Sequence, residues 1–247
     1  MKLKGKGINH TSSRASEGSP AYGVDPSQVQ DDVCERSEQL QGQFIVVEGL
    51  EGAGKTTAIQ TIRDYLDSKT QSLVITREPG GTRVGELVRA LIKEEVQGET
   101  LDGRTELLLL YAARVQHVAE VIKPALREGD WVLSDRFELS TIAYQGGGRG
   151  IDRALISQIS EIALQGFTPD LTFFLDIQPE EGLHRVRQRG KFDRIESESL
   201  DFFHKVYQAY HDAILPMQNI ISIDASQSLA SVQQSIIAHL EQFYAKL

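Results

Sequence analysis

A glycine-rich loop followed by lysine and threonine carries the clearest chemical signal in the sequence. Residues 49–56 read Gly-Leu-Glu-Gly-Ala-Gly-Lys-Thr, which matches G-x-x-x-x-G-K-[ST]. Glycines let successive backbone N–H groups turn inward, and a helix beginning near Lys55 points its positive dipole end at the same place. Lys55 can bind the β- and γ-phosphates of ATP, and the Thr56 hydroxyl can bind Mg²⁺. The predicted nucleotide-binding residues are Gly49, Leu50, Glu51, Gly52, Ala53, Gly54, Lys55 and Thr56.

Asp135 is the second expected magnesium ligand. It ends the apolar run 131–134, where the acidic residue of a Walker-B strand would stand, and it would bind Mg²⁺ directly or through water. The alternative is a carboxylate that caps a helix or faces solvent. The prediction of a nucleotide loop does not depend on which is true.

Arginines are concentrated in one short segment of the later half, at Arg185, Arg187, Arg189 and Arg194. They could be solvated, or paired with Glu180 and Glu181. On a helix, however, Arg185 and Arg189 are spaced i,i+4, so their like charges repel unless an anion such as a polyphosphate lies between them. Guanidinium groups also suit the charge of a transferring phosphoryl group. The chain has no Asn-Lys-x-Asp guanine motif and no Asp-Glu pair at a strand end. A kinase is therefore favoured over a GTPase or a water-activating ATPase.

Strand and helix patterns alternate along residues 43–247 and must position these groups. Short apolar runs predict strands at 44–47, 73–76, 131–134, 171–177 and 220–223. Amphipathic spacing predicts helices at 56–68, 84–93, 105–125, 151–164, 179–189, 199–215 and 228–244. The pattern predicts an α/β fold, with a doubly wound, mostly parallel five-stranded sheet and helices on both faces. Polar residues follow the strands, so one site is expected beyond the carboxyl ends of the sheet.

Composition excludes several classes of protein. The chain has 247 residues, of which 40% are hydrophobic and 25% charged, as in ordinary globular proteins. No apolar run approaches the roughly 18 residues that span a bilayer, and the N-terminus lacks the apolar segment of a secretory signal. A net charge of −9 disfavours nucleic acid as a partner. The single cysteine, Cys34, fits a reducing cytoplasm.

Residues 1–42 differ from the rest of the chain. They are rich in Ser, Gly, Gln and charged residues and show no hydrophobic periodicity, which predicts a disordered N-terminal extension before a domain over 43–247. The extension could be a solvated tail, a start codon assigned too far upstream, a regulatory or partner-binding arm, or an organelle transit peptide.

Several motifs together resemble the bacterial thymidylate kinases, from about residue 43 to the C-terminus. The motifs are Phe44–Thr57, Thr76-Arg-Glu-Pro-Gly-Gly-Thr82, Tyr111-Ala-Ala-Arg114, Ser134-Asp-Arg136, Ala143-Tyr-Gln-Gly-Gly-Gly-Arg-Gly150 and Phe192-Asp-Arg-Ile-Glu196. The P-loop is widely shared, whereas the Arg-Glu-Pro-Gly-Gly-Thr and Tyr-Gln-Gly-Gly-Gly-Arg-Gly segments are much more specific. The resemblance implies a P-loop NTPase fold and transfer of the γ-phosphate of ATP to dTMP with Mg²⁺, a step towards dTTP.

The resemblance also implies roles for individual residues. Glu51 falls where the family contacts the acceptor sugar, Arg136 where it holds the dTMP phosphate, and Arg114 where it reads the thymine edge. Positions near the base and the 2′-carbon are Ser140, Thr141, Tyr144 and Gln145, and the acceptor side is lined by Arg77 and Glu78.

A mobile lid over about residues 180–197 is implied to supply the catalytic arginine, since the P-loop position used by other family members is Gly52. Arg189 is the first choice, with Arg185 and Arg194 as rivals. Adenine is expected near the lid and near Ala225 and Ser226.

The sequence departs from the family at Leu110, where related kinases place a Phe that stacks on thymine. Either Leu110 weakens that contact, or Tyr111 or Phe137 replaces it.

The sequence leaves the oligomeric state and the acceptor open. The helices at 84–93 and 105–125 could bury their apolar faces in the core or also form the homodimer that is usual in the family. The acceptor could be another nucleoside monophosphate or a nucleoside. The chain could also be a non-catalytic nucleotide-binding homologue, although Lys55, Thr56 and Asp135 are all present.

Overall fold

The structure, a computed structural model, describes residues 40–69, 72–94, 99–188, 190 and 193–247. A sheet of five strands lies at its centre, and all of the strand pairings are parallel. The strands are β1 (Phe44–Gly49), β2 (Leu73–Arg77), β3 (Trp131–Asp135), β4 (Leu171–Asp176) and β5 (Ile220–Asp224). Their order in the sheet is β2-β3-β1-β4-β5. The predicted five-stranded α/β sheet is confirmed.

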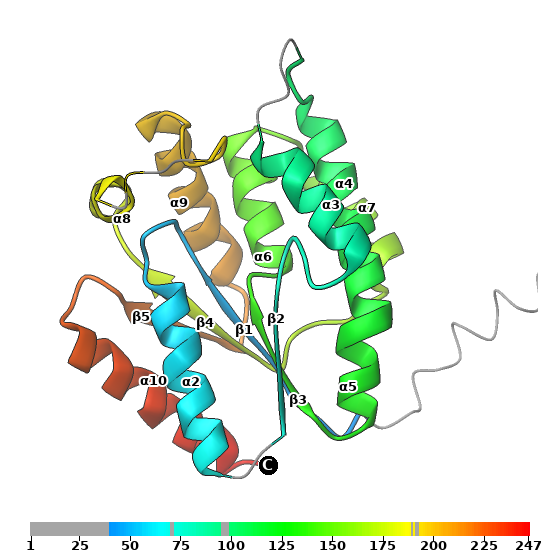
Figure 1. The fold of residues 1–247 in the computed structure, drawn as a ribbon. Helices are drawn as coiled ribbons and strands as arrows, with labels where there is room; N and C mark the ends of the chain where they lie inside the picture. The colour runs from blue at the N-terminus through cyan, green and yellow to red at the C-terminus, as the bar shows by residue number, and fades with distance from the viewer. Residues whose placement is uncertain (1–39, 70–71, 95–98, 189, 191–192) are drawn as a thin grey trace, which may run out of the picture. The chain divides into compact units, whose positions relative to one another are not determined.

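Helices cover both faces of the sheet (Figure 1). One face carries α2 (Lys55–Ser68) and α10 (Leu229–Tyr244). The other face carries α4 (Gly103–His117), the π-helical segment η2 (Val118–Ile122), α5 (Lys123–Arg127) and α7 (Arg153–Leu164). The remaining described helices are α3 (Arg83–Lys93), α6 (Glu138–Thr141), the π-helical η3 (Ile142–Gly148), α8 (Pro179–Arg187) and α9 (Leu200–Ile214).

The central strand β1 is buried on both faces because its side chains alternate in direction. Ile45 and Val47 belong to the same apolar cluster as Ile62 of α2. Phe44 and Val46 belong to the cluster on the opposite face, with Ile122 of η2. A strand covered on both sides needs a continuous apolar run, and residues 44–47 supply one.

From β1 the chain forms β2 and β3 on one side of this strand, and after β3 it crosses over to form β4 and β5 on the other side. In open α/β sheets such a switch point is where ligands bind, beyond the carboxyl ends of the strands. Val47 and Arg77 are both in register with Asp135. The polar residues at the carboxyl ends of β1, β2 and β3 therefore meet at one edge of the sheet, as the sequence predicted.

The segment after β3 corrects the sequence prediction, which placed no helix between residues 136 and 150. The structure has α6 and η3 there. A Cβ atom on Gly147 would lie 2.4 Å from the Cβ of Ala209, and one on Gly148 would lie 2.4 Å from a ring carbon of Phe202. These glycines therefore permit close packing against α9, and this tertiary contact outweighs the weak helix propensity of a glycine run. The helix expected over 105–125 is likewise three consecutive segments that end at Arg127.

Residues 1–39 lie outside the described part of the chain, so the disordered extension stays a prediction. The backbone N–H groups of Gln41 and Gly42, just before β1, each donate to the carbonyl oxygen of Leu126 at 3.0 Å. These residues are therefore attached to the domain. Among the helices of the described residues, none is both long and apolar enough to cross a membrane.

Candidate active site

The loop between β1 and α2 is shaped by its glycines. Gly54, with φ of 93°, precedes α2, whose first turn receives no side-chain cap in the described structure. A Cβ atom on Gly52, which has φ of 77°, would lie 2.1 Å from the carbonyl oxygen of Gly182. Glycine is thus needed at both positions. The uncapped N–H groups and the positive end of the helix dipole together form a site suited to an anion.

Lys55 bends back over this loop. Its Nζ donates to the carbonyl oxygens of Gly49 at 3.0 Å and Leu50 at 2.8 Å. Burial, reinforced by the positive charge of Arg136, lowers the pKa of Lys55 to about 8. The ammonium is therefore charged at neutral pH but is only weakly held in that state, and an anion bound beside it would raise its pKa again.

Polyphosphate binding is expected to weaken as the pH rises through about 8. Below that pH the free protein already carries the charge on Lys55, whereas above it the neutral amine must take up a proton when the anion binds. Calorimetric titration with ADP, in buffers of different ionisation enthalpy, should show proton uptake near pH 9 that is much smaller near pH 7.

The Lys55→Met variant is the control for this pH dependence, because the methionine side chain is of similar length but cannot take up a proton. Equal affinity and equal proton uptake at both pH values in the unmodified protein would contradict the assignment to Lys55.

Asp135 and Thr56 fit a magnesium site at the end of β3. The Oδ1 atom of Asp135 is buried and has no hydrogen-bond partner in the described structure, which leaves a carboxylate oxygen available to a cation. Thr56 lines the same pocket. No cluster of three or more His, Cys, Asp or Glu side chains suited to a metal occurs among the described residues. A single carboxylate with a hydroxyl suits Mg²⁺, which takes its other ligands from phosphates and water.

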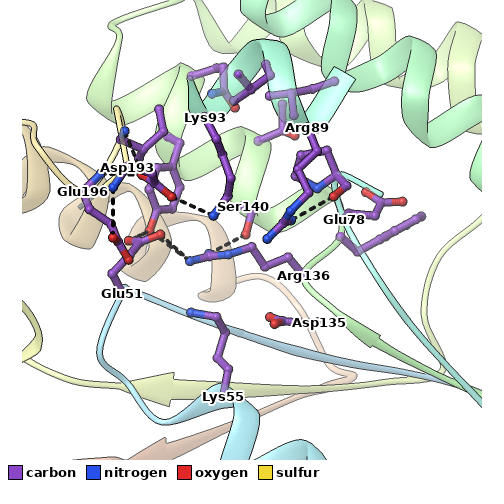
Figure 2. Close-up of a pocket in the computed structure, with 18 of the residues that line it drawn as sticks. Glu51, Lys55, Glu78, Arg89, Lys93, Asp135, Arg136, Ser140, Asp193 and Glu196 are labelled. Carbon is purple, nitrogen blue, oxygen red and sulfur yellow. Dashed lines mark hydrogen bonds and ion pairs between the residues drawn. The ribbon is translucent and has the colours of Figure 1, made fainter. Parts of the chain in front are cut away.

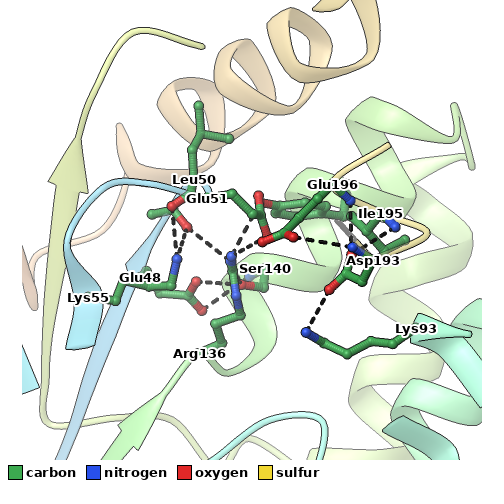
Figure 3. A network of polar contacts seen from close by, with 12 residues as sticks. Glu48, Leu50, Glu51, Lys55, Lys93, Arg136, Ser140, Asp193, Ile195 and Glu196 are labelled. Atoms are coloured by element: carbon green, nitrogen blue, oxygen red, sulfur yellow. Dashed lines mark hydrogen bonds and ion pairs between the residues drawn. The ribbon is translucent and has the colours of Figure 1, made fainter. Parts of the chain in front are cut away.

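Arg136 is held by a ring of oxygen atoms next to this site (Figure 3). Its φ of 73° lies in the left-handed region, which costs energy for a residue with a side chain. The Nη1 atom donates to the carbonyl oxygen of Gly49 and to Ser140 Oγ, both at 2.9 Å, and Nη2 donates to Glu51 Oε1 at 2.7 Å. The Tyr144 hydroxyl donates to Glu51 as well. Although burial opposes it, the charges of Arg136 and Lys55 hold the pKa of Glu51 below its ordinary value.

Glu48 binds the Ser140 side chain that contacts Arg136. Glu48 was not identified as a site residue from the sequence. It is fully buried, and its Oε1 accepts from the backbone N–H groups of Phe137 at 2.9 Å and Ser140 at 3.1 Å. Its Oε2 accepts from Ser140 Oγ at 2.6 Å and from the Tyr210 hydroxyl at 3.1 Å. Burial raises the pKa of Glu48. The carboxylate thus anchors the start of α6, directly after Arg136.

Arg114 of α4 lines the same pocket as Lys55. Its Nε donates to Glu78 Oε2 at 2.6 Å, and Nη2 donates to Thr141 Oγ1 at 2.9 Å. The fully buried His117 ring holds the other Glu78 oxygen, with Nδ1 at 3.0 Å from Oε1. The Nη1 atom of Arg114 is buried without a hydrogen-bond partner in the described structure. Arg114 therefore has the two N–H groups of Nη1 left for a ligand.

A cavity of about 480 Å³ connects these groups (Figure 2), a size suited to small molecules. Ile92, Leu110, Phe137 and Ile195 form its apolar wall. Tyr111 does not line the cavity, and its hydroxyl donates to Glu138 at 3.1 Å. Of the two aromatic residues that could replace the missing Phe at position 110, Phe137 is therefore the one beside the cavity.

Most of the site residues predicted from the sequence meet in this cavity. Those lining it are Glu51, Gly52, Gly54, Lys55, Thr56, Glu78, Leu110, Arg114, Asp135, Arg136, Ser140, Thr141, Tyr144, Gln145 and Arg185. Arg185 Nη1 also reaches the carbonyl oxygen of Ala225 at 3.1 Å.

The other predicted residues that belong to the described part of the chain do not line the cavity. Gly49, Leu50 and Ala53 are parts of the loop that turn away from it, and Ala225 lies behind Arg185. Arg77 pairs with the exposed Glu86, and Arg194 pairs with the buried Glu106. Arg189 lies outside the described residues.

Four charged residues that the sequence reasoning missed also line the cavity: Arg89, Lys93, Asp193 and Glu196. Lys93 Nζ donates to Asp193 Oδ2 at 2.7 Å, and Arg89 Nη1 donates to the carbonyl oxygen of Pro79 at 2.9 Å. The signal that could have identified the basic pair is its i,i+4 spacing on the helix that follows β2, at the carboxyl edge of the sheet.

Comparisons with known proteins agree on one family. The model of the thymidylate kinase family matches residues 47–236. A thymidylate kinase of Legionella pneumophila (strain Corby) is 54% identical over 204 residues, which cover 83% of this chain and 96% of the relative. Thymidylate kinases of Shewanella sp. (strain MR-4) and Vibrio vulnificus (strain YJ016) are each 50% identical, over 82% and 84% of this chain and 97% and 98% of the relatives.

Proposed function

We propose how this chain binds its phosphate donor, its metal ion and its acceptor. The premise is that the chain belongs to the thymidylate kinase family and phosphorylates dTMP on the route to dTTP. The observation that carries the arrangement is a pair of buried polar atoms without partners in the described structure, Asp135 Oδ1 and Arg114 Nη1. Both residues line one cavity. Asp135 lies near Lys55 of the P-loop (Figure 2), whereas Arg114 comes from α4.

The donor is ATP, with its phosphates on the P-loop. The uncapped start of α2 and the Lys55 ammonium offer donors to the β- and γ-phosphates. Arg185 closes the donor end from α8, where its Nη1 lies 3.4 Å from the carbonyl oxygen of Gly52. Thr56 and Asp135 would hold Mg²⁺, which neutralises phosphate charge when bound.

The acceptor dTMP occupies the other half of the cavity. Arg136, fixed by Glu51 and Ser140, presents its guanidinium to the acceptor phosphate. Arg114 uses its remaining Nη1 donor on the edge of the thymine base. Tyr144, which hydrogen-bonds Glu51, lies where an aromatic ring would exclude a ribose 2′-hydroxyl. Arg77 pairs with Glu86 and does not line the cavity, so it would contact the acceptor only from outside.

The side chains of the site then position the two nucleotides and neutralise phosphate charge, and none of them reacts covalently. The dTMP phosphate is already anionic near neutral pH, so no general base is required. The lid arginines stabilise charge on the transferring phosphoryl group, and a closed lid excludes water, which would otherwise hydrolyse ATP. We place this reaction in the cytoplasm.

The Leu110→Phe variant should bind dTMP more tightly, because a phenyl ring at this wall adds an aromatic face for the base. We expect the KM for dTMP to fall by about three- to tenfold, while the KM for ATP stays unchanged. Steady-state kinetics with Ile162→Phe, at an exposed position of α7, as the control would measure this. An unchanged KM would mean that Phe137 already fills the stacking position.

We also propose that the chain forms a homodimer through the neighbouring helices α3 and α4. These helices expose a group of large apolar side chains: Val84, Leu87, Leu91, Leu108 and Val115. Contiguous exposed apolar surface favours association, and the family resemblance supports a second copy of the chain as the partner.

A coupled assay of ADP release across acceptors tests the proposed substrate. dTMP should give the highest kcat/KM, above dUMP, dGMP and thymidine. Faster turnover with another acceptor would assign a different substrate. ATP binding without any acceptor-dependent turnover would indicate a non-catalytic homologue.

A further inference from the structure

Glu106 is a fully buried carboxylate that the proposed mechanism does not use. It lies in the first turn of α4, and Leu110 and Arg114 follow it at i+4 and i+8 on the same helix face. Both of these residues line the acceptor half of the cavity, whereas Glu106 itself does not. It therefore lies directly behind the acceptor wall.

Three side chains from two other segments converge on this carboxylate. Gln145 Nε2 in η3 donates to Oε1 at 2.6 Å, Arg149 Nε donates to the same oxygen at 3.3 Å, and Arg194 Nη2 donates to Oε2. Although burial opposes it, Arg194 and Arg149 hold the pKa of Glu106 below its ordinary value. The group is thus an ionised acceptor, and every neighbour that contacts it must donate.

The segment 193–196 is fixed through Arg194. The backbone N–H of Arg194 donates to the carbonyl oxygen of Lys93 at 3.0 Å, and its Nε donates to that of Ile92 at 2.7 Å. Arg194 points at Glu106, whereas Asp193, Ile195 and Glu196 line the cavity. Figure 3 shows this segment beside Lys93. The Arg194–Glu106 pair therefore holds Ile195 in the apolar wall.

Glu106 also determines the orientation of the Gln145 amide. An ionised carboxylate cannot donate, so the Gln145 nitrogen must face it, and the amide oxygen is left for another partner. Gln145 lines the cavity. Its amide oxygen accepts no hydrogen bond from the described residues. This oxygen would accept from a pyrimidine with N3–H, as in thymine, and would oppose the lone pair of a cytosine N3.

We propose that Glu106 is a positioning residue for the acceptor base: it fixes the Gln145 amide in the thymine-selective orientation and anchors the wall that contains Ile195. This inference rests on the proposed acceptor site. It also gives Arg194 the role of an anchor rather than of a mobile lid arginine.

Glu106→Gln tests the inference, because the new amide can donate as well as accept and so no longer fixes Gln145. We expect the KM for dTMP to rise about tenfold or more, the preference for dTMP over dCMP to fall by a similar factor, and the KM for ATP to stay within about twofold. Calorimetry with dTMP alone should show the same loss of affinity without turnover.

Glu198→Gln is the matched control. Glu198 also accepts from Arg149, but it contacts neither Gln145 nor Arg194 in the described structure, so the dTMP and dCMP constants should not change. If Glu106→Gln does not fold, Arg194→Met releases the segment while Gln145 and Arg149 still satisfy Glu106. It should raise the KM for dTMP without changing that for ATP.

Unchanged dTMP binding and unchanged base preference in a folded Glu106→Gln variant would overturn the inference. Equal rises in both KM values, with no change in base preference, would also overturn it, because a purely structural role predicts that outcome. A wild-type protein without dTMP-dependent turnover would instead overturn the proposed function itself.

Discussion

Replacing Lys55 with alanine is expected to lower kcat by on the order of 10³ or more, because the ammonium supplies the mobile positive charge at the transferring phosphate. Lys55 is poised for this role: its Nζ contacts the carbonyl oxygens of Gly49 and Leu50, and its pKa is lowered to about 8 without a bound anion. Single-turnover measurement of dTDP formation at saturating ATP and dTMP would separate this effect from weaker binding.

Lys205→Ala is the control for this substitution. Lys205 is an exposed lysine of α9 that pairs with Asp201, so its removal should leave kcat unchanged. A Lys55→Ala protein that melts like the wild type and retains wild-type kcat would remove the P-loop from the chemical step.

Substitutions of the lid arginines, Arg189 and Arg185, are expected to have the second large effect on catalysis. Arg189→Ala is expected to lower kcat by on the order of 10³, the scale of an arginine that stabilises phosphoryl charge. Arg185→Ala should act differently, chiefly by raising the KM for ATP, because Arg185 contacts the backbone around the donor end at Gly52 and Ala225. Steady-state kinetics with ATP varied at saturating dTMP would distinguish the two.

Arg187→Ala provides the comparison for both lid variants. Arg187 is exposed on α8 and lies two positions from Arg185, so it faces a different side of the helix from Arg185. Unchanged kcat in Arg189→Ala together with a large loss in Arg185→Ala would transfer the catalytic role to Arg185.

The sheet and the P-loop could be predicted because local signals determine them. The apolar run 44–47 can be satisfied only by a strand covered on both faces, and the structure buries it in that way. The glycine pattern of 49–54 is likewise a local backbone requirement, which the left-handed φ of Gly52 and Gly54 reflects. The position of Asp135 in the site could be predicted because this residue ends an apolar strand.

Features that depend on tertiary contacts could not be predicted in the same way. The helical segments between Glu138 and Gly148 depend on packing against α9, and a run of glycines in the sequence does not predict such packing. The direction of Arg194 depends on the buried Glu106, 88 residues earlier in the chain. Arg77 is the last residue of β2, at the expected edge of the sheet, yet Glu86 of the next helix pairs with it outside the cavity. Long-range ion pairs of this kind leave no spacing pattern in the sequence.

Calorimetric titration of the purified protein tests the central claim most directly, namely that one cavity holds a triphosphate at Lys55 and a second anionic nucleotide at Arg114 and Arg136. With Mg²⁺ present, a non-hydrolysable ATP analogue and dTMP should each give saturable heat, and binding of one should not abolish binding of the other. Heat from neither nucleotide, or strict competition between them for one site, would contradict the account.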